Sequence, residues 1–367
     1  MTADREVFMK DILLVNMFSK NESSYTDYYI EELEKAGLTY ESIYFERYDM
    51  DAEAGENELL FKEYCPTGGS KVKKLGIMSR YARFVRNTIQ KGNYKGIMVF
   101  TTVPAIMISD LLIGRYAKRY LFDIRDYTHE NIGLYYQIEE MLIRNAFATV
   151  ISSRGFLKWL PAGDYVVTHN VARTDPSDYP AKALNTDNCR IGYVGSIRYY
   201  EPNIQLLNQF RNRDRYHLDY YGTFAKGCDL EAYCRANDIQ NVSFFGRYNN
   251  DDKKEIYRNI DVINSVYGIQ SLETSTLMPH RLYDAAIYKC PIIVSKNSYL
   301  AEVVEKYGLG FAADEETESI PELLDDYLET YDADTFAGNC ERFLNDVAED
   351  MQRQKDVIRV FIKKMRQ

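Results

Sequence analysis

Three polar side chains near the start of one expected helix give the clearest chemical signal in the sequence. His280 and Arg281 follow Pro279, which suits the first turn of a helix because its missing N–H is not needed there. A helix start also offers unpaired N–H groups and the positive end of the helix dipole, so it can hold an anion such as a phosphate. Asp284 lies one turn later on the face of His280, where a carboxylate suits a ligand hydroxyl. The pattern predicts a site that binds a phosphate and a sugar together.

The segment around these residues has the pattern of a helix, a buried strand and a second helix. The first helix is expected from Pro279 to about Lys289, because the residue before Pro291 disfavours the α region. Residues 291–295 are apolar and β-branched, which is typical of a parallel strand covered on both faces. The second helix is expected to end at Gly308. An ordinary αβα unit with solvated basic side chains gives the same pattern. The other segments of the chain must therefore show whether this unit binds a ligand.

Length and composition indicate a globular protein with two domains. At 367 residues the chain exceeds the size at which one hydrophobic core keeps growing. Hydrophobic residues make up 46% and charged residues 27%, which is ordinary for a globular protein. The six cysteines form no CxxC pair and no cluster with histidine at metal-ligand spacing, so we expect reduced thiols, no bound metal and a cytoplasmic protein. The N-terminal sequence has the pattern of neither a signal peptide nor a membrane span.

The charge is distributed unevenly along the chain. The formal net charge is -10, yet residues 71–125 carry 12 basic and only 2 acidic side chains. Within this stretch, residues 71–91 have apolar side chains near helical spacing with Lys and Arg between them, which predicts an amphipathic basic helix. Its apolar face is expected to consist of Val72, Leu75, Met78, Phe84, Val85 and Ile89. Such a helix either rests on anionic lipid headgroups or is a core helix with a solvated basic face. Nucleic acid is not an expected partner, because the chain is acidic overall and has no binding motif.

Alternating strands and helices are expected in both halves. In the first half, strands are expected near residues 11–18, 39–45, 96–101, 119–124, 149–152 and 165–169, with a loop over 46–70 and one helix over 103–116. In the second half, strands are expected near residues 190–194, 217–221, 242–245, 260–265 and 291–295. We therefore expect a first domain over 1–170, a linker over 171–188, a second domain over 189–348 and a C-terminal helix in 349–367 that crosses back to the first domain.

Several motifs of other nucleotide-dependent enzymes are absent from the sequence. There is no GxGxxG dinucleotide fingerprint, no Walker A pattern, no nucleophile elbow and no HExxH. Residues 192–197 form a glycine turn after the first strand of the second domain, and Arg198 follows it. A glycine turn followed by a cation favours a diphosphate over a dinucleotide.

Five segments follow one another along residues 190–312 in an order that resembles a known family. They are IGYVGSIRYY, LDYYGT, VSFFGRY, IYRNIDVINSVYG and RLYDAAIYKCPIIVSKNSYLAEVVEKYGLGF. This order is similar to the donor domain of GT-B glycosyltransferases of the family 4 (group 1) type. The first half resembles that family more loosely, through ATVISSRGFLKWL, YVVTHNV and IRDYTHE. The resemblance implies an α/β protein of the GT-B fold, with two Rossmann-like domains that face each other across a cleft. The first would bind the acceptor and the second a nucleotide-sugar donor.

The resemblance also implies roles for single residues of the glycine turn and the nucleobase segment. The turn and a nearby basic residue, which meet the donor diphosphate in the family, correspond to Gly195, Ser196 and Arg198. The segment that borders the nucleobase corresponds to Arg247 and Tyr248.

The helix that begins near Pro279 both matches the family pattern and departs from it. The acidic residue that binds the ribose corresponds to Asp284. The family usually has a second glutamate eight positions earlier, where this chain has Thr276, so the chain departs from the family at this contact with the sugar. In the family a lysine often follows the basic residue of the glycine turn, where this chain has Glu201 and Pro202. Arg281, Arg247 or His280 could supply that second positive charge.

The chemistry implied is transfer of a sugar from a nucleotide donor with retention of the anomeric configuration. Negative charge develops on the departing diphosphate, so Arg198, Arg281 and the helix start would stabilise the transition state without a metal ion. Tyr267 and Gly268 are expected to line the sugar pocket, because glycine permits close approach of backbone to ligand.

Two residues of the first domain are candidates for the acceptor side. Asp126 and His129 follow a strand at the end where α/β sheets bind ligands. They could orient or deprotonate an acceptor hydroxyl, or they could be a turn cap and a surface histidine.

The expected partners follow from the resemblance and from the basic helix. We expect a UDP-sugar donor, no cofactor, and a glycan or lipid-linked glycan acceptor of bacterial surface-polysaccharide biosynthesis. The basic helix over residues 71–91 suggests peripheral contact with the inner face of the membrane. Two other functions remain open: a nucleotide-sugar epimerase, and a non-catalytic GT-B subunit that supports a partner enzyme.

Overall fold

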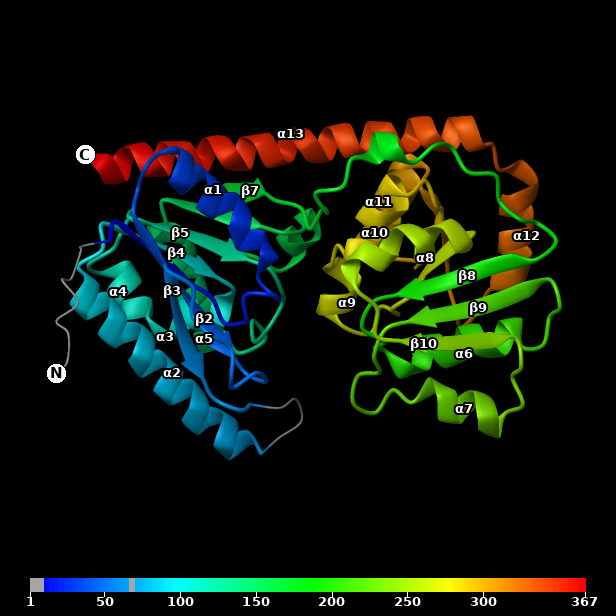
Figure 1. The fold of residues 1–367 in the computed structure, drawn as a ribbon, viewed down its shortest axis with the longest axis horizontal. Coiled ribbons are helices and arrows are strands. Elements are labelled where there is room, and N and C mark those ends of the chain that lie inside the picture. The colour runs from blue at the N-terminus through cyan, green and yellow to red at the C-terminus, as the bar shows by residue number, and fades with distance from the viewer. Residues whose placement is uncertain (1–9, 66–69) are drawn as a thin grey trace. The chain divides into compact units, whose positions relative to one another are not determined.

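The chain consists of two compact units, each built around one parallel sheet (Figure 1). The computed structural model describes residues 10–65 and 70–367. Residues up to His169 together with Glu349–Gln367 form the first unit, and Asn170–Ala348 form the second. Helices cover both sheets, which is the Rossmann-like α/β architecture expected from the sequence.

The sheet of the first unit has seven strands in the order β3-β2-β1-β4-β5-β6-β7, and all neighbouring strands are parallel. Its strands are β1 Ile12–Val15, β2 Tyr40–Glu46, β3 Glu58–Lys62, β4 Gly96–Phe100, β5 Tyr120–Ile124, β6 Ala148–Ile151 and β7 Tyr165–Val167. Its helices are η1 Ser24–Thr26, α1 Asp27–Lys35, α2 Lys71–Gly92, α3 Thr102–Met107, α4 Ser109–Ile113, α5 Gly133–Asn145 and η2 Arg154–Lys158. The central strands are buried along their whole length, as the apolar runs predict.

Two predictions for the first unit are wrong. Residues 58–62 were expected in a loop but form β3, which pairs in parallel with β2 at the edge of the sheet. Its apolar run, residues 59–61, is only three residues long and lies between charged residues, so the sequence signal of this half-buried edge strand is weak. The part of the expected loop at 66–69 lies outside the described residues. The helix expected from Val103 to Tyr116 is broken into α3 and α4 at Ile108, whose backbone leaves the helical region.

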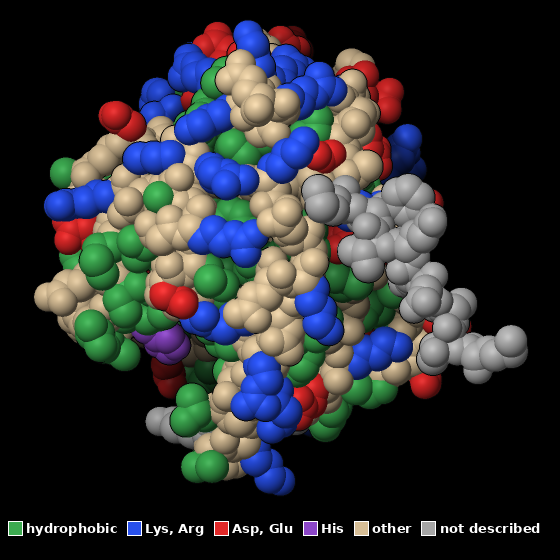
Figure 2. All heavy atoms as spheres, turned by 90° about the vertical axis from the view of Figure 1, so that its left-hand side faces the viewer, with side chains coloured by type: hydrophobic (Ala, Val, Ile, Leu, Met, Phe, Trp, Pro, Cys, Tyr) green, Lys and Arg blue, Asp and Glu red, His purple; other side chains and the backbone are tan. Residues whose placement is uncertain are grey.

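The basic helix α2 forms as predicted, but its apolar face is shorter than expected. Ile77, Tyr81, Val85 and Ile89 are buried against the first sheet. Val72 and Leu75 were expected on that face but are 80% and 72% exposed, because the first turns extend beyond the core. Figure 2 shows the side of the molecule on which α2 lies, where Lys and Arg side chains cover more of the surface than Asp and Glu.

The sheet of the second unit has six strands in the order β10-β9-β8-β11-β12-β13, again parallel throughout. Its strands are β8 Cys189–Val194, β9 Tyr216–Tyr221, β10 Val242–Gly246, β11 Val262–Ser265, β12 Ile292–Ser295 and β13 Gly310–Ala313. Its helices are η3 Pro176–Asp178, α6 Tyr200–Phe210, α7 Leu230–Ala236, η4 Asn250–Asp252, α8 Lys253–Asn259, α9 Leu272–Thr276, α10 His280–Ile287, α11 Tyr299–Tyr307 and α12 Ile320–Thr330. The strand β13 was not predicted, because it is short and begins at a glycine.

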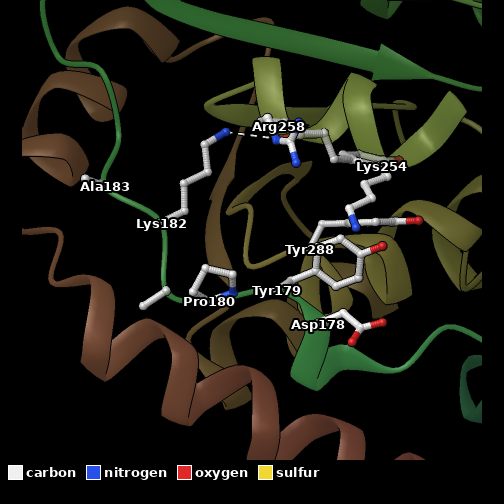
Figure 3. A pocket seen from close by; sticks show the side chains of 10 residues that line it. Asp178, Tyr179, Pro180, Lys182, Ala183, Lys254, Arg258 and Tyr288 are labelled. Atoms are coloured by element: carbon white, nitrogen blue, oxygen red, sulfur yellow. Dashed lines mark hydrogen bonds between the residues drawn. The ribbon is translucent and has the colours of Figure 1, made fainter.

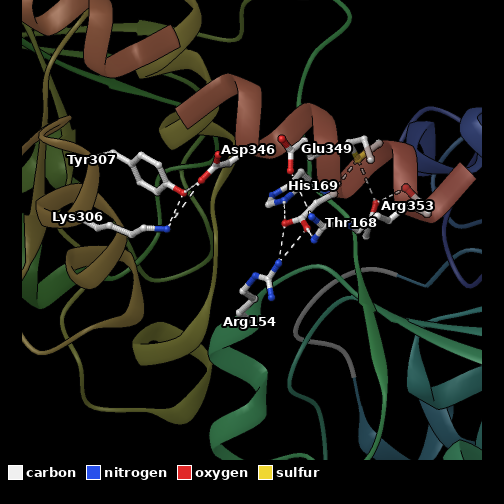
Figure 4. Close-up of polar contacts among 11 residues, drawn as sticks. Arg154, Thr168, His169, Lys306, Tyr307, Asp346, Glu349 and Arg353 are labelled. Carbon is white, nitrogen blue, oxygen red and sulfur yellow. Dashed lines mark hydrogen bonds and ion pairs between the residues drawn. The ribbon is translucent and has the colours of Figure 1, made fainter. Parts of the chain in front are cut away.

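The last helix, α13 Ala333–Arg366, contributes residues to both units. It is longer than the helix expected near residues 350–365. In the second unit, Phe343 packs against Tyr283 and Tyr307. In the first unit, Phe361 belongs to the core on one face of the sheet. Figure 4 shows polar contacts along the same helix, including the ion pair in which Arg154 Nη2 lies 2.9 Å from Asp350 Oδ1.

No helix in the described ranges is long and apolar enough to span a membrane.

Candidate functional site

The second sheet reverses its winding direction between the neighbouring strands β8 and β11. From β8 the chain continues to β9 on one side, and from β11 it continues to β12 on the other. In open α/β sheets this switch point is where ligands bind, at the carboxyl ends of the strands. The predicted residues Gly195, Ser196 and Arg198 follow β8, and Tyr267 and Gly268 follow β11. Both predicted segments therefore lie at the switch point.

The backbone at the end of β8 is open on the side where a side chain would otherwise stand. Gly195 has a φ of +134°, and a Cβ built on it would meet nothing within 4 Å. Gly222, at the end of the neighbouring strand, has a φ of +147°, and a Cβ there would lie 1.8 Å from the carbonyl oxygen of Gly195. Both positions need glycine for their backbone conformation, and Gly222 needs it also for close packing. The space above Gly195 allows a ligand to approach the backbone.

The start of α6 lies directly after this turn. Tyr199 occupies the N-cap position with a φ of +59°, and its side chain makes no capping hydrogen bond. The buried Asn203 fixes the turn, because its side-chain amide donates to the carbonyl oxygens of Arg198 at 2.8 Å and Tyr199 at 2.9 Å. Ser196 and Arg198 are exposed, and the Arg198 guanidinium donates from Nε to Ser196 Oγ at 3.4 Å. A helix start with nearby hydroxyl and guanidinium donors can bind the phosphates of a ligand.

Arg281 is buried in a cage of aromatic rings and is only 5% exposed. Its Cζ lies 3.6 Å from the ring centroid of Tyr193 and 4.7 Å from that of Tyr267. It donates to the carbonyl oxygen of Asn264 at 2.5 Å and to the Tyr267 hydroxyl. Burial alone would lower the pKa of Arg281, but the phenol oxygens of Tyr193 and Tyr267 outweigh burial and raise it. The guanidinium is therefore charged and held between the two strand ends.

Tyr193 connects this cage to the glycine turn. Its hydroxyl donates to the carbonyl oxygen of Ser196 at 3.0 Å and accepts the N–H of Arg198 at 3.4 Å. On the other side, the N–H groups of Tyr267 and Gly268 donate to Ser295 Oγ at 3.2 and 2.9 Å. These bonds fix the loops after β8 and β11 in place.

Asp284 is 2% exposed and is held by two donors from α8. Lys253 Nζ lies 2.9 Å from Asp284 Oδ2, and the Tyr257 hydroxyl donates to the same oxygen at 2.8 Å. Among the described residues, Oδ1 has no hydrogen-bond partner, so it can accept a bond from a ligand hydroxyl. Burial, with a smaller contribution from the charge of Asp284, raises the pKa of Tyr248.

Lys253 and Glu273 are two residues at this edge that the sequence did not reveal. Lys253 belongs to a run of charges, DDKKE, that has the pattern of a solvated surface. Glu273 is exposed at the start of α9 and accepts a hydrogen bond from the Tyr199 hydroxyl at 3.3 Å. Neither contact has a sequence signal, because each joins elements far apart in the chain.

Thr276, at the position where the family has a glutamate, is buried inside the second unit. Its side chain is 0% exposed, and its hydroxyl donates to the carbonyl oxygen of Leu272 at 2.6 Å within the same helix. The nearest carboxylate along the chain, Glu273, is instead exposed beside Tyr199. In this chain the acidic group near the glycine turn is therefore Glu273, three residues before Thr276 in α9.

The remaining predicted residues of the second unit lie at the surface. His280 is exposed as the first residue of α10, and Pro279 is the N-cap rather than the first helical residue. Arg247 is exposed directly after β10. The structure thus brings Arg281, Tyr267, Tyr248 and Asp284 together around the switch point, with His280 and Arg247 on the surface of the same unit.

In the first unit, Asp126 and His129 lie exposed after the carboxyl end of β5. The ring of His129 packs edge-on against Tyr135, with centroids 5.6 Å apart. The preceding residues are fixed by a buried ion pair, in which Arg125 Nη2 lies 2.7 Å from Asp123 Oδ2. This loop is held firmly enough to present two polar side chains at a strand end.

A buried carboxyl group lies in the helix that follows this loop. Glu139 is 0% exposed, and its contact with the Thr102 hydroxyl is long, at 3.4 Å. Burial, with a smaller contribution from the charge of Glu130, raises the pKa of Glu139 to about 8. Nearby, Thr101 has a φ of +68°, an uncommon conformation for a β-branched residue. Strained backbone and buried titratable groups cluster at functional sites, so this end of the first sheet is a second candidate.

No group of three or more His, Cys, Asp or Glu side chains in the described part of the chain is placed to hold a metal ion.

Solved structures of similar architecture cover nearly the whole chain. HepE from Anabaena, solved with UDP and glucose, is 15% identical with a TM-score of 0.64 and covers 97% of this chain and 98% of its own. Sucrose-phosphate synthase from Thermosynechococcus elongatus is 14% identical with a TM-score of 0.63, covering 97% and 94%. WaaG, a glycosyltransferase of lipopolysaccharide biosynthesis, is 11% identical with a TM-score of 0.64, covering 95% and 99%.

The chain has the GT-B fold. This confirms the fold predicted from the order of the segments in the second half and from the two sets of alternating strands and helices. No protein-family model and no curated protein sequence matches the chain. At 11% to 15% identity the likeness concerns the fold, and the activity has to be argued from the site.

Proposed function

We propose that the protein is a retaining glycosyltransferase that moves a sugar from a UDP-sugar to a glycan or lipid-linked glycan acceptor. The observation that carries the proposal is the switch point of the second sheet. There an open glycine turn and the start of α6 lie at the carboxyl end of the sheet. Asp284, a buried aspartate whose Oδ1 is available to a ligand, lies at the same end. Such a site can bind diphosphate and ribose together. The GT-B neighbours that are solved with UDP and glucose, or named as glycosyltransferases, support the same class of substrate.

In this proposal the diphosphate lies against Gly195, Ser196 and the start of α6, and Arg198 is the cation that contacts it. Negative charge grows on the leaving diphosphate as the sugar bond breaks, so donors already fixed in place lower the barrier. Asn203 holds the Arg198 carbonyl group and so fixes the turn before the ligand arrives. The reaction as proposed relies on these protein donors rather than on a metal ion.

Arg281 has a positioning role in the proposal. Its guanidinium bonds to Asn264 and Tyr267 and is enclosed by rings, so it acts through the loops it joins. Loss of this residue would loosen Tyr267 and Gly268, which line the sugar pocket.

Asp284 binds the ribose in this proposal, and Tyr248 borders the nucleobase. Lys253 and Tyr257 orient the carboxylate through Oδ2 and leave Oδ1 for a ribose hydroxyl. Glu273 takes the place of the glutamate that the family has at the position of Thr276, because its carboxylate is exposed near the glycine turn. It would contact a hydroxyl of the transferred sugar. His280 and Arg247 remain candidates for further cationic contacts with the donor.

The acceptor binds to the first unit in this proposal. Asp126 and His129 would orient or deprotonate its hydroxyl at the end of β5.

Contact with an anionic membrane surface is part of the same proposal. Val72 and Leu75 are exposed at the start of α2, next to the exposed Lys73. Exposed apolar side chains beside cations suit lipid headgroups, and each cation contributes about 1 kcal/mol near an anionic surface. Arg80 and Arg86 already pair with Glu63 and Asp110, so the first turns of the helix would make most of the contact.

The membrane contact can be tested by vesicle sedimentation. A Val72→Ser/Leu75→Ser variant should bind vesicles that contain anionic lipid more weakly than the parent protein, while neither protein binds neutral vesicles. Equal binding of both proteins to anionic vesicles would remove the membrane contact from the proposal.

The proposed reaction is tested by following UDP-sugars in solution. The protein should release UDP slowly from one UDP-sugar, and with an added acceptor the anomeric signals of the product should show retention. The Asp284→Asn variant should lose UDP binding, whereas Asp219→Asn should keep it. Asp219 is a matched control, because it is also buried in the second unit and paired with a cation, Arg190. Interconversion of UDP-sugars would instead identify an epimerase, and neither reaction together with no UDP binding would identify a supporting subunit.

A further inference from the structure

The second unit contains a cavity of about 430 Å³ that none of the predicted donor-binding residues lines. It lies between residues 178–183, a segment expected to be a plain linker, and the helix α8, with Tyr288 from the end of α10 (Figure 3). All of its lining residues belong to one unit, so its shape does not depend on how the two units are placed.

Three tyrosines form the aromatic part of this cavity. Tyr257 and Tyr288 are stacked, with centroids 4.5 Å apart and ring planes at 17°. Tyr179 meets Tyr288 edge-on, with centroids 4.7 Å apart and ring planes at 70°. The rings therefore form a corner rather than a parallel slot. A planar base binds best between parallel rings, whereas a sugar ring needs one aromatic face for its C–H groups and polar partners for its edges.

Three cations stand around the same space (Figure 3). Lys182 Nζ donates to the carbonyl oxygen of Tyr257 at 3.1 Å, which fixes the lysine against the end of α8. Lys254 Nζ lies 5.6 Å from the ring centroid of Tyr179. Arg258 pairs with Glu255 of its own helix at 2.8 Å, and both side chains are 64% exposed, so water screens this pair and the arginine can turn to a ligand. Asp178 is the one carboxylate in the lining, which leaves the cavity with an excess of positive charge.

We propose that this cavity is a second saccharide site, which binds a sugar unit that carries a negative charge. The half-buried Tyr179 would take the face of the sugar ring, backed by Tyr257 and Tyr288, which are only 1% and 8% exposed. Lys254 and Arg258 would bind the carboxylate or phosphate of the sugar, and Asp178 would accept a hydrogen bond from a hydroxyl. A volume of about 430 Å³ accommodates one or two sugar rings. Charge-assisted bonds to Lys and Arg give the preference for an anionic sugar over a neutral one.

The cavity shares one residue with the donor site. The Tyr257 ring lines the cavity, while its hydroxyl bonds to Asp284. The saccharide site nevertheless does not rest on the proposed transferase activity, because Lys254, Arg258 and Tyr179 take no part in that proposal. A failure of one proposal is therefore distinguishable from a failure of the other.

The test is ligand-detected NMR, by saturation transfer from the full chain in the presence of excess UDP. The probes are glucuronic acid, glucose 6-phosphate and neutral glucose. Inorganic phosphate has no carbon-bound proton, so its affinity is measured by competition against the bound anionic sugar. The proposal predicts binding of at least one of the two anionic sugars, with glucose and inorganic phosphate about tenfold weaker or more. Comparing the affinities of the two anionic sugars shows whether the site prefers a sugar carboxylate or a sugar phosphate.

Single substitutions locate the binding. Lys254→Ala and Arg258→Ala should each weaken binding of the anionic sugar about tenfold, the usual effect of losing one charge-assisted bond. Arg235→Ala is the control, because Arg235 is exposed on another helix of the same unit and pairs with Glu231 of its own helix, as Arg258 does with Glu255. It should leave binding unchanged. The proposal is overturned if neither anionic sugar binds, if glucose or phosphate binds as tightly, or if Arg235→Ala has the effect of Arg258→Ala.

Discussion

Replacing Glu139 by glutamine should stabilise the first unit, and the gain should grow as the pH rises. Glu139 is fully buried, and burial raises its pKa from the ordinary value of 4.5 to about 8. Between these two values the folded protein keeps a proton that the unfolded chain has released, so the folded state binds more protons. The stability of the wild type therefore falls as the pH rises from about 4.5 to about 8. Glutamine has the same shape, keeps the contact with Thr102 and does not titrate.

The size of the effect follows from the shift in pKa. One pKa unit corresponds to about 1.4 kcal/mol, so a shift of this size amounts to roughly 3 to 5 kcal/mol over the whole range. The two proteins should have nearly equal unfolding free energies at pH 4.5, and Glu139→Gln should be more stable by about 1.4 kcal/mol for each pH unit above it, up to pH 8.

Urea unfolding can report on this unit alone. The chain has a single tryptophan, Trp159, which is buried in the core of the first unit, so its fluorescence follows the unfolding of the unit that holds Glu139. Glu140→Gln is the control, because Glu140 is the next residue but lies at the surface in a pair with Arg144. The difference in unfolding free energy between Glu140→Gln and the wild type should not change with pH. If the unfolding free energies of the wild type and Glu139→Gln change with pH in parallel, the pKa of Glu139 is not raised in the folded protein.

Three further substitutions probe the second unit, each measured by urea unfolding and by UDP binding. Gly222→Ala should destabilise it by about 2 kcal/mol or more and abolish UDP binding, because its Cβ would lie 1.8 Å from the Gly195 carbonyl oxygen. Near-native stability would contradict the required close packing. Arg281→Lys should cost about 1 to 3 kcal/mol and weaken UDP binding, because an ammonium group cannot make the bonds of the guanidinium. Unchanged UDP binding would show that the cage does not fix the site. Ser298→Ala should cost about 1 kcal/mol through loss of the cap of α11, with UDP binding intact.

Much of the fold could be predicted from the sequence, because local pattern decides it. The apolar runs of the central strands predict buried parallel strands, and the glycine at 308 ends α11 as expected, with a φ of +66°. The edge elements β3 and β13 were not predicted, because their apolar runs, residues 59–61 and 311–313, are only three residues long and each strand takes its place by pairing with a neighbour. The exposure of Val72 and Leu75 could not be predicted either, because their helical spacing predicts a buried face and the core does not extend to them.

The candidate site could be predicted in position but not in its contacts. The glycine turn, Tyr267 and Asp284 have a signal in the sequence, and they lie at one end of the sheet. The bonds of Lys253 to Asp284 and of Tyr199 to Glu273 join residues that are 31 and 74 positions apart, so only tertiary structure reveals them. Arg281 has the sequence pattern of an exposed anion ligand and is instead enclosed by rings, because α10 is buried along residues 281–287.

UDP binding to the parent protein and to Asp284→Asn is the most direct test of the proposed donor site. At 100 times its dissociation constant, UDP should stabilise the parent by about 2.7 kcal/mol in a thermal or urea unfolding experiment. The Asp284→Asn variant should fold and lose most of this stabilisation, while Asp219→Asn keeps the UDP effect. The donor site is wrongly assigned if UDP does not stabilise the parent protein, or if it stabilises Asp284→Asn equally.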